Sequence, residues 1–192
     1  MKKLILLLLI PILSVGQIIK EGSRQIHLDF HTSGLIENIG ENFSKEQFKK
    51  ALKIGNVNSI NIFGKGHHGY SYYNTKIGTR HPHLKFDLLK EQIEACHEMG
   101  VTAQVHFTVG WSQKDADDHP EWILKDKNGT TNKLEILKKL GPNDRLPNFT
   151  WRLLAPSNGY DEFILKQVEE ICVNYDIAVS YTHLRAHETV KN

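Results

Sequence analysis

The 192-residue chain has little of several features that mark particular classes of protein. It has only two cysteines, Cys96 and Cys172, and because both fall in predicted helices we expect small buried residues rather than a disulfide. Neither sign of charge dominates, with 24 Lys and Arg against 22 Asp and Glu, so neither nucleic acid nor a membrane surface is indicated as a partner. Internal repeats, a phosphate-binding glycine loop, a nucleophile elbow and a structural zinc pattern are missing too. We therefore expect an ordinary globular domain, and we predict no cofactor and assign no metal ligands.

Long apolar runs are also scarce. The segment Leu4–Leu13 is too short to span a bilayer comfortably. Two lysines precede it, and Ser14 and Gly16 follow it with the small-x-small spacing of a signal peptidase site. We expect residues 1–16 to be a signal peptide, the protein to be secreted or periplasmic, and no membrane partner to remain after cleavage.

The last residues have an unusual origin. Val179–Thr189 reads as the translation of a transposon-end adapter used to prepare sequencing libraries. We interpret residues 179–192 as an artefactual tail and give its His183, His187 and Glu188 no functional weight. Residues 17–178 are then the part of the chain that bears on fold and function.

Three short segments alternate strictly between apolar and polar residues, as strands do. They are Gln25–His31, Ser59–Phe63 and Thr102–Thr108, and amphipathic helical patterns separate them. Their polar sets are His27, Asp29 and His31 in the first, Ser59 and Asn61 in the second, and Thr102, Gln104, His106 and Thr108 in the third. We predict an α/β fold, an incomplete (β/α)8 TIM barrel of about the first three β/α units, whose polar strand faces line the interior. The alternative is a half-exposed antiparallel sheet with its polar side in water.

Helices and loops are expected between these strands. Ser44, with Gln47 three residues later, caps a helix that Gly55 ends, and Asp87 caps the next helix, which Gly100 ends. A last helix is predicted from about Tyr160 to Tyr175. The loops at 64–85 and 110–158 are unusually long, and such loops tend to be functional.

Aromatic and imidazole side chains gather at the predicted strand ends. Sugars present hydroxyl groups along the ring edge and a weakly apolar C–H face, so sugar sites combine hydrogen-bonding groups with aromatic platforms. The candidate carbohydrate-binding residues are His31, His67, His68, Tyr73, His106 and Trp111, with Arg80 and His81 supporting the loop.

Several motifs resemble a known family. Lys65–Tyr70, followed by Tyr73–Thr75, resembles the second-strand motif of α-L-fucosidases, which reads Lys-His-His-Asp-Gly-Phe and then Trp-x-Ser. Without gaps, only His67 coincides with a fucose-contacting histidine, because Gly66 and His68 stand where the motif has His and Asp. The chain is still more similar to uncharacterised glycosyl hydrolases related to that family. That similarity is carried by His27–His31, Lys65–Gly69, Ser71–Tyr73, Arg80–Leu84, His119–Trp122 and Asn174–Ile177.

The resemblance implies a secreted TIM-barrel glycoside hydrolase that acts on a carbohydrate. Residues 17–178 are expected to be the N-terminal part of its catalytic domain, because a complete barrel needs about 250 residues. Glycoside hydrolysis uses two carboxylates, and in the resembled families the nucleophile is an Asp ending strand four, which is expected beyond Ile177. Asp29 lies between two imidazoles, where a buried structural role is expected, and Glu121 is expected on a surface loop. We therefore expect this chain to supply part of a substrate site and to lack hydrolase activity alone.

Two other functions are left open. His27, Asp29 and His31 at two-residue spacing resemble ligand pairs of amidohydrolase-type barrels, in which a metal activates water. A secreted, non-catalytic carbohydrate-binding barrel is the second alternative.

Overall fold

The computed structural model describes residues 24–125, 127, 151–157, 159–177 and 179–183. The predicted signal peptide therefore lies outside the described residues. Four parallel strands form the main sheet: β1 (Gln25–His27), β2 (Ser59–Lys65), β5 (Thr102–Thr108) and β6 (Val179–His183). They lie side by side in chain order, β1 next to β2, β2 next to β5 and β5 next to β6. The predicted parallel pairing is confirmed, and the antiparallel alternative is wrong.

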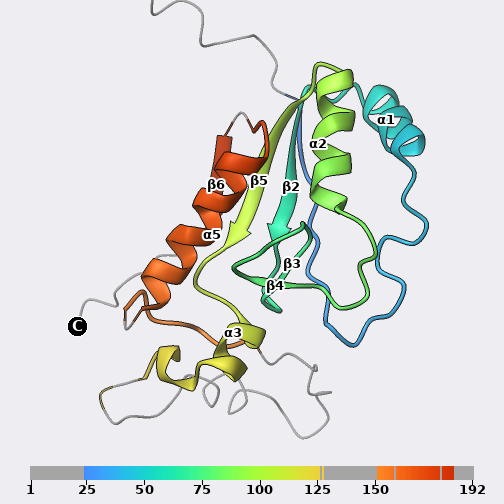
Figure 1. Ribbon diagram of the computed structural model, residues 1–192. Helices are drawn as coiled ribbons and strands as arrows, with labels where there is room; N and C mark the ends of the chain where they lie inside the picture. The colour runs from blue at the N-terminus through green and yellow to red at the C-terminus, as the bar shows by residue number, and fades with distance from the viewer. Residues whose placement is uncertain (1–23, 126, 128–150, 158, 178, 184–192) are drawn as a thin grey trace, which may run out of the picture.

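The helices begin where their caps predict. The Ser44 hydroxyl accepts the Gln47 N–H at the start of α1 (Lys45–Ile54), and the Asp87 carboxylate accepts the Lys90 N–H at the start of α2 (Leu88–Glu98). The last helix is α5 (Tyr160–Asn174). In Figure 1, α2 and α5 lie over the sheet and α1 lies beside α2. The fold is thus a mixed α/β arrangement with a partial parallel sheet. No helix within the described residues has the length and apolar character needed to cross a membrane.

One face of the sheet forms the apolar core with the helices. Ile60 and Ile62 of β2 and Val105 of β5 are at most 2% exposed and pack in one cluster with Ile93 of α2 and Ile171 of α5. Burying an aliphatic side chain of this size stabilises the fold by about 1.5–3 kcal/mol relative to leaving it exposed. This packing fixes which strand residues face the helices, and their neighbours in sequence face the opposite side.

Strand β1 is shorter than predicted. We expected a strand through His31, but pairing with β2 ends near Leu28, whose N–H donates to the Asn61 carbonyl. The chain then leaves the sheet, and the Thr32 N–H donates to the Tyr72 hydroxyl at 3.0 Å. Side chains on β1 are exposed, including 42% of Ile26, so its outer face is only partly covered in the described part of the chain.

The loop after β2 carries two short strands. Strand β3 (Tyr70–Ser71) pairs antiparallel with the end of β2, and β4 (Thr79–Arg80) pairs parallel with β3. The loop after β5 contains α3 (Gln113–Asp118) and the 3-10 helix η1 (Pro120–Trp122). Both loops follow the carboxyl ends of their strands, the edge at which ligands bind in parallel sheets.

Strand β6 lies in the segment that we interpreted as an artefactual tail. Its residues pair with β5 in parallel, from Gln104 opposite Val179 to Thr108 opposite His183. Such pairing uses backbone groups, which any strand-forming sequence can offer to the open edge of β5. The pairing of β6 with β5 therefore does not test whether residues 179–192 are an artefact.

Candidate functional site

Histidine and aromatic rings gather on the sheet face opposite the helices. The rings of Phe63 on β2 and His106 on β5 stack with centroids 4.3 Å apart. His27 of β1 meets both edge-on, at 5.3 Å and 5.6 Å. His31 lies 4.9 Å from Phe63 and stacks on His67 at 3.7 Å. We call these residues, together with His68 and Trp151, the histidine cluster.

His31 is held by protein partners at both ring nitrogens. Its Nδ1 accepts the backbone N–H of His67 at 2.9 Å, and its Nε2 lies 3.0 Å from the Asp29 carboxylate. The ring therefore carries its proton on Nε2 and donates it to Asp29. Burial lowers the pKa of His31 below its ordinary value, although the neighbouring carboxylate opposes this. His31 thus orients the turn at His67. Asp29 is not buried as expected, because its side chain is 67% exposed.

The aromatic platform of the cluster is Trp151, which we did not select from the sequence. Its ring lies 4.5 Å from His67, 5.4 Å from His31 and 5.5 Å from His68. Burial lowers the pKa of His68, which favours a neutral imidazole at neutral pH. Neutral imidazoles close to an indole ring offer hydrogen bonds and an apolar surface together, as a sugar ring requires. The only signal in the sequence was a tryptophan in a long loop after a strand.

Two predicted site residues lie elsewhere. Tyr73 is fully buried in the core between the sheet and the helices, where its ring meets Tyr175 at 5.8 Å, so it cannot contact a sugar. The half-exposed Trp111 pairs through its backbone with Leu153, and its indole points away from Asp115. In the described part of the chain, the tryptophan next to His31, His67 and His68 is Trp151 and not Trp111.

His81 and Arg80 belong to the loop that follows β2. His81 is 1% exposed, and its Nε2 lies 2.9 Å from the Ser33 carbonyl. This contact ties the loop to the segment after β1, and the burial of His81 leaves it no surface for substrate. Arg80 is half-buried on β4, opposite Ser71 of β3.

The three alternating polar residues of the first segment do not form a metal site. Asp29 pairs with His31, whereas His27 packs against aromatic rings. Across the described ranges, no group of three or more His, Cys, Asp or Glu side chains is arranged to hold a metal ion. The ligand set that the amidohydrolase alternative requires is therefore not formed by these residues.

Comparison with known proteins identifies the family. Residues 44–178 match the family described as "Hypothetical glycosyl hydrolase 6". The chain belongs to this family of glycosyl hydrolases. It is also similar to the structure of α-L-fucosidase isoenzyme 2 from Paenibacillus thiaminolyticus, with 36% identity and a TM-score of 0.75. That similarity covers 85% of this chain and 24% of the fucosidase, so the chain spans about a quarter of that relative.

More distant structures share the fold alone. A maltogenic α-amylase from Thermotoga neapolitana is 15% identical, with a TM-score of 0.51, over 84% of this chain and 39% of its own. The α-fucosidase of Thermotoga maritima in complex with fucose is 18% identical, with a TM-score of 0.50, over 74% of this chain and 29% of its own. A search of curated proteins found no match. The sequence-based recognition of a glycosyl hydrolase related to the fucosidases is confirmed.

Proposed function

We propose that this chain forms the first β/α units of a TIM-barrel glycoside hydrolase, and that its histidine cluster binds a fucose-like sugar. The observation that carries the proposal is the convergence of His67, His68 and Trp151 at the carboxyl ends of parallel strands. Substrates of β/α barrels bind at this edge. The fucosidase that is 36% identical supports the choice of sugar.

The partial barrel is supported by the sheet itself. Strands β1, β2 and β5 follow one another in space as they do in sequence, with helices packed on one face, as in the wall of a barrel. Among the described residues β1 pairs with β2 alone, so its other edge is where a barrel would continue; Ile26 (42% exposed) and Leu28 (38% exposed) lie at this strand and just after it. From its first residues we also propose that the protein is secreted or periplasmic.

We propose further that this chain alone does not hydrolyse glycosides. The reaction needs two carboxylates, about 5–9.5 Å apart, facing one glycosidic bond. Asp29, the carboxylate beside the cluster, is engaged with His31, and Asp115 is engaged with Lys65. The catalytic pair would then come from outside the described residues. Incubation with 4-nitrophenyl α-L-fucoside should release no nitrophenolate above the buffer rate, and release above that rate contradicts the proposal.

Sugar binding can be tested by nuclear magnetic resonance. L-Fucose titrated into the chain should shift the imidazole signals of His67 and His68 saturably, and D-fucose should shift them less. His67→Ala should abolish the effect on His68. His97→Ala is the matched control, because His97 lies at the end of α2 that leads into the start of β5, far from the carboxyl ends. Equal shifts with both sugars, or none with L-fucose, would refute the proposed sugar site.

A further inference from the structure

Helix α3 holds the turn that carries His67 and His68. The backbone N–H groups of Gln113 and Lys114, in its first turn, donate to the carbonyls of His67 and His68 at 3.1 Å each. Gly69, in the left-handed region with φ +87°, completes the turn, and a side chain there would collide with the Ser112 hydroxyl. The position of α3 therefore determines where the backbone of His67 and His68 lies.

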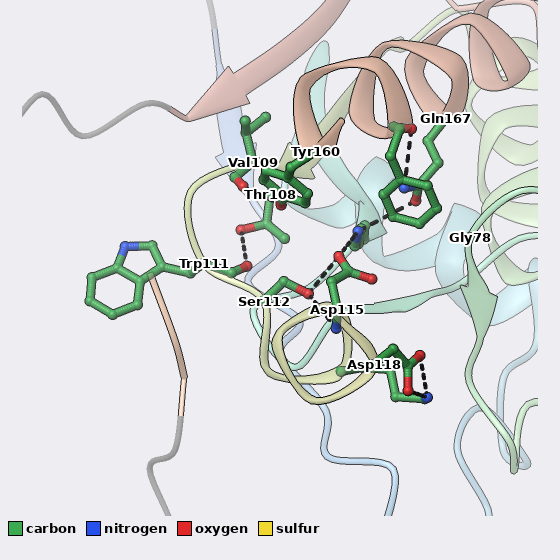
Figure 2. Close-up of polar contacts among 12 residues, drawn as sticks. Gly78, Thr108, Val109, Trp111, Ser112, Asp115, Asp118, Tyr160 and Gln167 are labelled. Carbon is green, nitrogen blue, oxygen red and sulfur yellow. Dashed lines mark hydrogen bonds and ion pairs between the residues drawn. The ribbon is translucent and has the colours of Figure 1, made fainter. Parts of the chain in front are cut away.

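A buried ion pair in turn fixes α3. Lys65 Nζ lies 2.5 Å from the Asp115 carboxylate, and their side chains are 0% and 2% exposed. The same carboxylate oxygen accepts the Ser112 hydroxyl at 2.7 Å, and Gln167 of α5 lies 3.4 Å from Lys65 Nζ. Figure 2 shows Ser112 and Asp115 of the α3 region facing Gln167 across this network. The network joins β2, α3 and α5.

An irregularity in β2 makes this arrangement possible. The register between β2 and β5 shifts between Phe63 and Lys65, so that Lys65 lies opposite Phe107. Phe63 faces the histidine cluster, whereas Lys65 Nζ lies over the rings of Phe107 and Phe163 near α5. Only Gly66 separates Lys65 from His67, so a shift of the Lys65 backbone is passed directly to the turn that carries His67 and His68.

We propose that Asp115 and Lys65 are positioning residues, which hold α3 so that its first turn orients His67 and His68 for the sugar. This inference rests on the proposed sugar site. The pair keeps α3 next to β2, because separating Lys65 from Asp115 would leave each charge buried without its partner. Burial lowers the pKa of Lys65, although the Asp115 carboxylate opposes this. When either partner is removed, α3 moves so that the remaining charge is no longer buried unpaired. The carbonyls of His67 and His68 then lose the N–H groups of Gln113 and Lys114 that donate to them.

The test compares Asp115→Asn with Asp118→Asn in the full chain. Asp118 is a matched control, because it is on the same short helix, is 42% exposed and pairs only with Lys114 in the described part of the chain. In Asp115→Asn, hydrogen exchange at the Gln113 and Lys114 amides should accelerate at least about tenfold while α2 amides keep their protection. The dissociation constant for L-fucose should rise about tenfold, and Asp118→Asn should match the unaltered chain in both respects.

A second variant keeps the inference testable if Asp115→Asn does not fold. Lys65→Met combined with Asp115→Met removes both charges, a change that proteins often tolerate. It should fold, and exchange at Gln113 and Lys114 should still be fast, because the hydrogen bonds from Lys65 and from the Ser112 hydroxyl that hold α3 through Asp115 are gone. Slow exchange at these amides, or equal acceleration in α2, overturns the inference. Hydrogen exchange is measured without sugar. If L-fucose does not bind the unaltered chain, the proposed function is refuted, and the exchange test of α3 still stands.

Discussion

Gly66 occupies a position with no room for a side chain. A Cβ atom there would lie 2.7 Å from the Tyr72 hydroxyl oxygen and 3.1 Å from the Phe30 carbonyl oxygen. Gly66 is not among the residues with positive φ, so its requirement is steric rather than conformational. The Tyr72 oxygen is itself engaged, with Thr32 N–H at 3.0 Å and Thr32 Oγ1 at 2.9 Å. The substitution Gly66→Ala should therefore displace Tyr72 from Thr32.

The expected cost can be worked from these contacts. Loss of two buried hydrogen bonds costs about 1 kcal/mol each, and overpacking a well-filled site adds about 1–3 kcal/mol. The reduced freedom of alanine in the unfolded chain returns about 0.4–1 kcal/mol. We expect Gly66→Ala to lower the free energy of unfolding by about 2–4 kcal/mol. Urea unfolding followed by tryptophan fluorescence at low protein concentration measures this change.

A second substitution tests the cause. Tyr72→Phe removes the oxygen that the new methyl group meets. Combined with Gly66→Ala, it should cost at least about 1 kcal/mol less than the sum of the two single variants. Gly110→Ala is the control, because the nearest atom to a Cβ there is Leu153 Cδ1 at 3.4 Å, an ordinary contact. A Gly66→Ala variant within about 0.5 kcal/mol of the unaltered chain, or additive costs in the double variant, would refute the steric explanation.

Acid and thiol reagents probe the same packing. His31, His68 and His81 have pKa values below the ordinary value of 6.5, chiefly through burial. The unfolded chain then binds protons first, so the free energy of unfolding should fall between pH 7.5 and 5.5; urea curves showing a flat or rising free energy contradict this. Burial raises the pKa of Cys96 to about 11, whereas Cys172 is exposed and unpaired, so the expectation of a buried residue is wrong for Cys172. Iodoacetamide at pH 8 should label only Cys172 until urea is added, and mass spectrometry detecting early label on Cys96 contradicts its burial.

Much of the candidate site could be predicted because it depends on local order. Four of the residues that converge, His31, His67, His68 and His106, were selected because they lie near the ends of predicted parallel strands, which end at one edge of a sheet; the period of two fixes the face of His106 on β5. Tyr73 was misplaced for the same reason that Lys65 was overlooked. The register shifts within β2 just before Lys65, and Tyr73 lies in the loop after β2, so strand alternation does not predict which way either side chain points.

The sequence by itself determined the parallel α/β order, the caps of α1 and α2, and the glycosyl hydrolase family, because each depends on neighbours within a few residues or on a contiguous motif. Only the tertiary structure decided that Trp151 packs on the histidines, that His31 uses both ring nitrogens on protein partners, and that Lys65 pairs with Asp115. These contacts join segments from 36 residues apart (His31 and His67) to 120 residues apart (His31 and Trp151), except the Asp29–His31 pair, whose members are two residues apart. Their geometry is set by how the helices and loops pack, which short-range patterns do not encode.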